Sequence, residues 1–442
     1  MKSESGIWLA TGALVLAFGA LIGMGASGVT VLLVALIGLF ISYFVGSWMA
    51  RPADASWIAK WVVLGFLAKL AGTAARYYMV TVIYESGDSY RYYRVGAELA
   101  AQWRNGDIPP LTGSGSFGTQ VTEAFTGGLF AFITPDFLGG FLLFAIFAYL
   151  GQILLYAAFR RHARPNQLKP YAFMIFFLPT YAFWPSSIGK DALVLLALGG
   201  CAYSVSRALE AFQVRWLFTL GISLAAVGLI RIHIAGLVVG AFALSALIAR
   251  IPSRDRGGVF FRRVLTLSAG VAAAVLVISL FPDLFGVDVL NTQARDDFTA
   301  DLVRRTSEEE IVNSDYAVST PLDVPNALSH VLFRPYVFEA SELQQYLAAA
   351  ETSLVLLLAL WRLPTILKNL GKWRSNPYVV FSTFYTLGFA VAFSVVQNLG
   401  IIARQRGQVF AFFMAIIIGL GWPAEEEEGV NPSSKPSAAL TG

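Results

Sequence analysis

Apolar runs long enough to cross a lipid bilayer follow one another through most of this chain of 442 residues. A helix needs about 20 apolar residues to span the hydrocarbon core, because each residue advances the helix by about 1.5 Å. Hydrophobic residues make up 56% of the chain and charged residues only 14%, which is unusual for a water-soluble globule of this size. The sequence therefore predicts an all-α fold, a polytopic bundle of transmembrane helices.

We count about twelve candidate spans, of which the fifth, seventh and twelfth are short. They cover residues 7–24, 29–49, 57–80, 136–159, 171–186, 190–208, 214–231, 233–250, 262–281, 346–364, 377–397 and 407–422. We expect one integral membrane domain over residues 1–422, with its first run retained because no small-residue cleavage pattern follows it. Residues 423–442, which open with a run of glutamates, are typical of a disordered tail.

The distribution of Lys and Arg predicts how the bundle is oriented. Basic residues gather in the short loops 160–169, 250–263 and 362–374, and alternating spans place these three loops on one face, which is then cytosolic. Both termini fall on the same face. The long loops 81–135 and 282–345 are predicted to lie on the outer, non-cytosolic face. This loop bias accounts for the net charge of +4, so no nucleic-acid partner is predicted.

Several classes of chemistry have no counterpart in the sequence. The single cysteine, Cys201, excludes a disulfide framework and a thiolate metal site. No phosphate-binding Walker loop, dinucleotide-binding glycine motif or His-Glu-x-x-His motif occurs. No metal site or certain cofactor is predicted, although a divalent cation held beside a phosphate stays an open alternative.

The first polar cluster follows the third span and contains Asp88. Asp88 fits the N-cap of a helix, and it also fits a carboxylate at the membrane surface that acts as a general base. We expect an amphipathic interfacial helix from about Tyr90 to Arg104, with Tyr93 on it as a supporting residue.

A second polar cluster places Lys190 and Asp191 directly before an apolar run. A helix that starts there presents its amide groups and a lysine to an anion, so Lys190 is a candidate phosphate ligand with Asp191 in support. The alternative is a lysine that reaches the membrane interface with Asp191 as its local partner. Arg231 and His233 follow where the seventh and eighth spans meet, and an arginine in such apolar surroundings needs a partner.

Two further pairs complete the predicted outer site. Arg404 and Arg406 occupy the last outward turn, where positive charge runs against the usual bias and calls for an anion. The anion is either one of the protein's own carboxylates or a lipid-linked phosphate. Arg334 and Glu339 lie among aromatic residues, which mark either the membrane interface or a platform for stacking sugars.

Between about Tyr84 and Gly407, the chain resembles bacterial envelope polysaccharide proteins of the membrane, namely O-antigen polymerase-like proteins and multi-spanning glycosyltransferases that use polyprenyl-phosphate sugars. The resemblance rests on short motifs: Asp88, Trp184-Pro185-Ser186 with Gly189-Lys190-Asp191, Arg231 with His233, Leu332-Phe333-Arg334-Pro335 with Glu339, and Arg404 with Arg406. It implies that Asp88 is the catalytic carboxylate and that Lys190, Arg231, Arg404 and Arg406 hold the phosphates. Here the aspartate follows the third span, whereas the glycosyltransferase branch has it after the first.

The resemblance implies glycosyl transfer or polymerisation of lipid-linked sugars at the outer face of a bacterial cytoplasmic membrane. Its implied partners are a polyprenyl-(pyro)phosphate-linked sugar, membrane lipids and other polysaccharide assembly proteins. Two alternatives remain open: a transporter or flippase of lipid-linked sugars, and a non-catalytic membrane assembly protein. The absence of similarity between the two halves of the chain weakens the transporter reading, because many carriers are built from duplicated halves.

Overall fold

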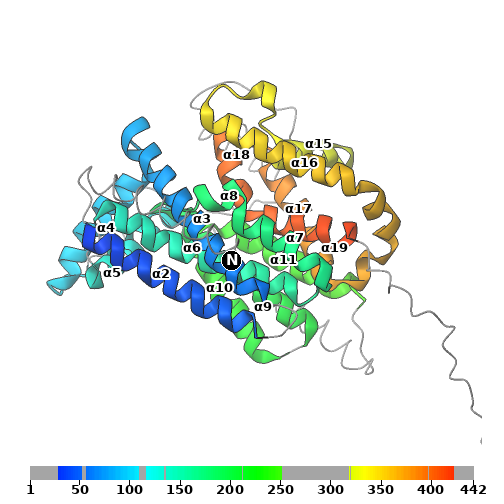
Figure 1. The fold of residues 1–442 in the computed structure, drawn as a ribbon, viewed down its shortest axis with the longest axis horizontal. Coiled ribbons are helices and arrows are strands. Elements are labelled where there is room, and N and C mark those ends of the chain that lie inside the picture. Colours follow the sequence, from blue (N-terminus) through cyan, green and yellow to red (C-terminus); the bar gives the residue numbers. More distant parts are fainter. Residues whose placement is uncertain are drawn as a thin grey trace, which may run out of the picture.

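The fold is seen in a computed structural model that describes residues 28–51, 56–108, 116–133, 136–211, 213–250, 318, 320–396 and 398–422. Every regular element in these ranges is a helix (Figure 1). The predicted spans 7–24 and 262–281, most of the loop 282–345 and the predicted tail lie outside the described residues.

Five described helices have the length and apolar composition to cross a membrane. They are α2 (Gly28–Met49), α3 (Trp57–Tyr78) with η2 (Met79–Ile83), α6 (Phe137–Arg160), α9 (Lys190–Glu210), and α16 (Leu343–Asn369) with η5 (Leu370–Ser375). A sixth candidate is bent by 59° and joins α18 (Leu399–Gln405) and η6 (Arg406–Gln408) to α19 (Phe410–Gly421). Shorter apolar helices are α10 (Val214–Ile230), α11 (Ile232–Ile248) and α17 (Pro377–Phe393). The helical membrane class is confirmed; the count of twelve spans is not.

The long helices divide into a core and a rim. Of the apolar stretch of each helix, 83% is buried in α6 and 78% in α9, but only 22% in α2 and 22% in α16. Figure 1 shows α2 and α16 on opposite margins of the molecule. Their outward faces carry Leu32, Phe40, Leu354 and Leu357, all more than half exposed. Apolar surface of this extent is costly in water, and lipid tails cover it.

The two core helices pack closely because glycines meet between them. A Cβ atom on Gly199 of α9 would collide with the backbone of Gly151 on α6, and a Cβ on Gly151 would collide with the backbone of Leu195. Small residues let membrane helices approach until their backbones touch, which is how packing holds helices together where the hydrophobic effect does not. The α6–α9 contact therefore positions Lys190 and Asp191 at the first turn of α9.

Two regions differ from the sequence-based expectation. The predicted span 171–186 is divided into α7 (Pro165–Phe177) and α8 (Pro179–Phe183), because Pro179 lacks an amide hydrogen and holds Leu178 in an extended conformation. The predicted outer loop 81–135 contains α4 (Asp88–Arg104), close to the amphipathic helix expected there, and a second helix, α5 (Phe117–Phe132). An ion pair of 2.7 Å between Arg91 and Glu123 joins α4 to α5.

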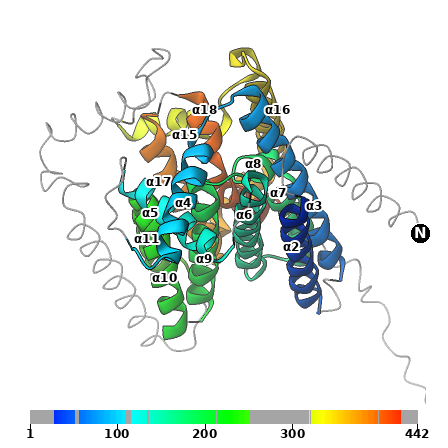
Figure 2. The same cartoon turned by 90° about the vertical axis from the view of Figure 1, so that its left-hand side faces the viewer.

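The bundle has two distinct ends. Figure 2 shows α2 and α3 side by side on one flank of the bundle and α10 on the other. The 21 residues of α9 separate Lys190 from Glu210 by about 30 Å. At the Glu210 end, Arg161 pairs with Glu210 at 2.6 Å and Arg374 donates to the carbonyl of Ile248. We call this the basic end, because residues of all three predicted basic loops meet there.

At the opposite end of α9, the described part of the predicted loop 282–345 forms short helices. These are η3 (Pro321–Asp323), α15 (Val324–Phe333) and η4 (Val337–Glu339). Contacts between α15 and α17 attach this segment to the bundle.

Candidate functional site

Five of the residues predicted to form the outer site lie together at the end of the bundle opposite the basic end. They are Asp88, Lys190, Asp191, Arg231 and Arg404, and we call them the Asp191 cluster. Each is placed by a helix terminus: α4 and α9 begin here, α10 and α11 are separated here by Arg231, and α18 ends here. The chain between Asp88 and Arg404 is 316 residues long, so the fold and not local sequence brings them together.

Asp191 is the centre of the cluster. Its Oδ1 accepts a hydrogen bond of 2.7 Å from Nη2 of Arg231, and its Oδ2 accepts one from Nε of Arg404. The side chains of Asp191 and Arg231 are each only 10% exposed. A buried carboxylate shared by two guanidinium groups fixes both arginines in place, because a charge left without a partner there would be costly.

Asp88 lies at the rim of the cluster. It is the first residue of α4, whose N-cap is Gly87, and the Asp88 side chain makes no capping bond. Gly87 has a φ of 133°, a conformation that favours glycine. The Asp88 carboxylate is 60% exposed and lies 3.4 Å from Nη1 of Arg404. Asp88 is therefore an accessible carboxylate beside a fixed cation.

Lys190 is held by hydroxyl groups of α5. Its Nζ donates to Oγ1 of Thr119 at 2.7 Å and to Oγ of Ser116 at 3.2 Å. Within the described part of the chain, no carboxylate lies within ion-pair distance of this amine. Lys190 thus keeps its positive charge uncompensated by a direct partner.

Sequence reasoning missed two members of this site, Arg76 and Tyr92. Arg76 of α3 lies within electrostatic range of Asp88, Asp191 and Arg404, and its guanidinium stacks 5.1 Å from the ring of Trp184. A charged residue inside a predicted span was the available signal for Arg76. With it, four cations face two carboxylates among the described residues of the site, which leaves two positive charges in excess.

No comparable pattern in the sequence points to Tyr92. Which of the adjacent tyrosines, Tyr92 or Tyr93, faces the cluster depends on the rotation of α4 about its axis. Burial raises the pKa of Tyr92 to about 12, with Asp88 adding to the effect. Its phenol is therefore protonated at neutral pH and lies near Thr119, the residue that holds Lys190. Tyr93 instead packs against Phe130 and Phe137.

Two cavities flank the Asp191 cluster. One of about 300 Å³ is lined by Lys190, Arg231 and His233 together with the start of α5. The other, of about 140 Å³, is lined by Tyr84, Trp184 and residues of α16 and α18. The Trp184 ring, on which Arg76 stacks, forms part of the second wall. Residues of the cluster line the first cavity, whereas the second cavity borders the site through Trp184 and Arg76.

The remaining predicted residues do not belong to the Asp191 cluster. His233 is exposed and lines the first cavity beside Arg231, and its ring lies 5.5 Å from that of Phe393. Arg334 pairs with Glu339 at 2.7 Å. Although burial opposes ionisation, hydrogen bonds from the Arg334 side chain and the Tyr336 amide hold the pKa of Glu339 below its usual range. This pair is locally neutralised and lies outside the cluster.

Arg406 does not join Arg404. Its side chain is fully buried and donates to the backbone carbonyls of Val331 and Arg334, with Glu351 as its nearest carboxylate partner. Glu351 in turn accepts from the backbone amide of Thr180 at 3.1 Å. Arg406 therefore ties α15, α16 and α8 around the bend before α19, a structural contact in place of the predicted phosphate contact.

Among the residues that the structure describes, no three His, Cys, Asp or Glu side chains are grouped so that they could hold a metal ion. The chemistry available to the cluster is that of fixed cations and one exposed carboxylate. Such a group can bind an anion and accept a proton beside it.

No protein-family model, curated protein or solved structure matches this chain.

Proposed function

We propose that this protein transfers or polymerises sugars carried on a polyprenyl phosphate or diphosphate, at the outer face of a bacterial cytoplasmic membrane, in the assembly of an envelope polysaccharide. The observation that carries the proposal is the Asp191 cluster: cations from α3, α9, the α10–α11 break and α18 converge on one membrane end with positive charge in excess. The resemblance in short motifs gives the class of substrate.

The arginines suit a diphosphate leaving group. A guanidinium offers a planar set of donors that matches phosphate oxygens, and Asp191 holds Arg231 and Arg404 before any substrate arrives. As the bond between the sugar C1 and the phosphate oxygen breaks, negative charge builds on the leaving phosphate. Preorganised cations stabilise that charge without rearranging during the reaction.

Asp88 is placed to serve as the base. Its exposed carboxylate adjoins Arg404, so an acceptor hydroxyl there lies beside the sugar carbon that loses the phosphate. In the step, Asp88 takes the hydroxyl proton, the acceptor oxygen bonds to C1 and the polyprenyl diphosphate departs with the bonding electrons. The cavity lined by Lys190 and Arg231 gives the phosphate of the donor a place beside these cations.

The orientation follows from the basic end. If that end is cytosolic, as the excess of Lys and Arg indicates, the Asp191 cluster faces outward. Soluble nucleotide sugars are absent there, so the donor must be lipid-linked. A donor of this kind reaches the cluster from the membrane, beside the apolar helices.

Replacing the arginines tests the proposal. In membranes supplied with a labelled polyprenyl-diphosphate oligosaccharide, Arg404→Ala and Arg231→Ala should each lower product formation by about 100-fold or more, because each removes a fixed donor to the leaving phosphate. The matched control is Arg215→Ala, which removes an arginine that stacks on Trp216 at the start of α10. It should leave the rate unchanged.

A second pair keeps the test decisive if an alanine variant does not fold. Arg404→Lys and Arg231→Lys retain the charge next to Asp191 but lose the planar donor set, so they should fold and still lose most of the activity. Wild-type amounts of product from folded Arg404 and Arg231 variants would rule out this site as the place of reaction.

The transporter alternative has one observation in its favour, namely charged residues next to broken helices. Lys69 of α3 donates to the carbonyls of Tyr181 and Pro185 beside the α7–α8 break, and Arg406 lies at the bend before α19. Both side chains are at most 1% exposed and donate to backbone carbonyls, although Nη1 of Arg406 has no partner among the described residues. These two side chains hold the broken helices in place, whereas residues that line a transport path need access from water. The enzyme is therefore better supported than the transporter.

A further inference from the structure

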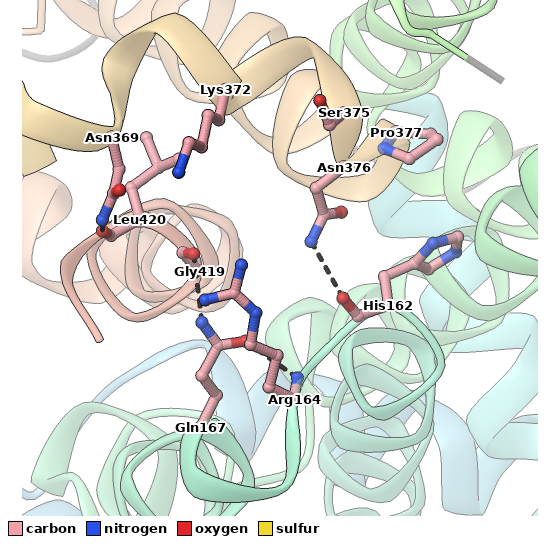
Figure 3. Close-up of a pocket in the computed structure, with 10 residues that line it drawn as sticks. All are labelled: His162, Arg164, Gln167, Asn369, Lys372, Ser375, Asn376, Pro377, Gly419 and Leu420. Carbon is pink, nitrogen blue, oxygen red and sulfur yellow. Dashed lines mark hydrogen bonds between the residues drawn. The ribbon is translucent and has the colours of Figure 1, made fainter. Parts of the chain in front are cut away.

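A second polar cavity lies at the basic end, away from the Asp191 cluster. It has a volume of about 290 Å³ and is bounded by the loop before α7, the end of α16, the start of α17 and the end of α19. Figure 3 shows the Arg164 guanidinium and the Lys372 amine extending from different elements into this space. We call it the basic cavity.

Nothing acidic lines the basic cavity. Its described lining contains Arg164, Lys372 and His162 but no Asp or Glu, and neither Arg164 nor Lys372 forms an ion pair with a described carboxylate. Burial lowers the pKa of His162, so its ring is neutral and the charge comes from the other two residues. Both side chains are exposed and can be reached from outside.

The described backbone carbonyls at the end of α19 accept hydrogen bonds from side chains other than Arg164 and Lys372. The carbonyls at the end of α19 are already satisfied, since the amide of Gln167 donates to Ile418 and Gly419 at 3.1 Å and that of Asn369 donates to Leu420 at 2.9 Å. Two helices, α7 and α17, begin at the cavity and two others, α16 and α19, end there, so the opposed helix dipoles offset one another and the attraction for an anion comes from Arg164 and Lys372.

We propose that the basic cavity binds a phosphate group, with Arg164 and Lys372 as its ligands. The cavity lies at one end of a bundle of membrane-spanning length, and anionic headgroups attract cations at such ends, so an anionic phospholipid and a free phosphate are the two sources of this group. The site lies about 30 Å from the Asp191 cluster along α9 and does not depend on the proposed reaction.

Native mass spectrometry of the full chain, with phosphatidylglycerol or phosphatidylcholine added, tests whether the bound phosphate group belongs to a lipid. We expect phosphatidylglycerol to bind preferentially, and the double variant Arg164→Gln with Lys372→Gln to bind it about 30-fold more weakly, given the typical contribution of one cation at a membrane surface. The matched control, Lys368→Gln with Arg250→Gln, removes two exposed cations from the same end that do not line the cavity. It should bind as the wild type does.

A second experiment tests free phosphate as the ligand: inorganic phosphate is added to the protein in phosphatidylcholine nanodiscs, and thermal unfolding is measured. Protection of the wild type against thermal unfolding, lost in the double variant but kept in the control, identifies free phosphate as the ligand. Equal lipid binding and equal phosphate protection in the double variant and the control overturn the proposal.

One more comparison excludes a competitor within the chain. Four glutamates, Glu425 to Glu428, follow α19 in the sequence, and their carboxylates carry the charge that the cavity attracts. In the full chain with all four changed to Gln, phosphate-group binding should equal that of the wild type. Binding that appears only in this variant shows that the protein's own glutamates fill the cavity, which contradicts the proposal.

Discussion

At the scale of single residues, Asp88 and Asp191 are two carboxylates with different tasks. Asp191 is 10% exposed and bridges Arg231 and Arg404. Asp88 is 60% exposed, and among the described residues its ion-pair partner is Arg404, at 3.4 Å. The same side-chain type thus serves as an anchor in one position and as a candidate base in the other, because their exposure differs.

This contrast predicts opposite effects of two matched substitutions. Asp191→Asn leaves two guanidinium groups without their shared partner and should lower the free energy of unfolding by about 3 kcal/mol. Asp88→Asn breaks only a long, exposed contact and should change stability by less than about 1 kcal/mol while abolishing sugar transfer. Thermal unfolding in detergent and a transfer assay on the same preparations separate the two. An inactive but equally stable Asp191→Asn, or an active Asp88→Asn, contradicts the division of tasks.

At the scale of helices, the α6–α9 contact determines where the cluster can form. Gly151 and Gly199 bring the two backbones together, and α9 then presents Lys190 and Asp191 at its first turn. Because the neighbour that a Cβ on Gly199 would meet is backbone and not a flexible side chain, the contact cannot relax by rotating a side chain.

Gly199→Ala should therefore destabilise the protein by about 2 kcal/mol, the typical cost of overpacking a well-packed core. The control is Gly221→Ala on α10, where an added Cβ meets no described atom within 4 Å. That change should be neutral or slightly stabilising, since alanine favours a helix over glycine. Melting temperatures of the two variants measure the difference, and equal values would show that α6 and α9 are not held by this close approach.

At the scale of the whole molecule, the sequence predicted the class better than the details. The apolar runs were sufficient for the all-helical membrane fold, and the charged residues flanking them were sufficient to name Asp88, Lys190, Asp191, Arg231 and Arg404. These groups are expensive near hydrocarbon, so their presence is a strong signal in a single sequence.

The rest depends on tertiary contacts that no local pattern encodes. Arg406 lies two residues from Arg404, but the bend before α19 turns its side chain into the interior, against the end of α15. The helices α7 and α8 were merged in the predicted span because the residues around Leu178 are apolar throughout, and only Pro179 marks the break. The rotation of α4 selects Tyr92 over Tyr93 in the same way.

The central claim is that the Asp191 cluster opens outward and holds a lipid-linked diphosphate. Cys201, the single cysteine, is buried, so a cysteine introduced at the rim is the group that an impermeant maleimide can reach. We predict that Asp88→Cys in intact cells is labelled from outside, that an added polyprenyl diphosphate protects it, and that Lys368→Cys at the basic end is not labelled. Labelling of Lys368→Cys in place of Asp88→Cys, or labelling of Asp88→Cys that the diphosphate leaves unchanged, would contradict the claim.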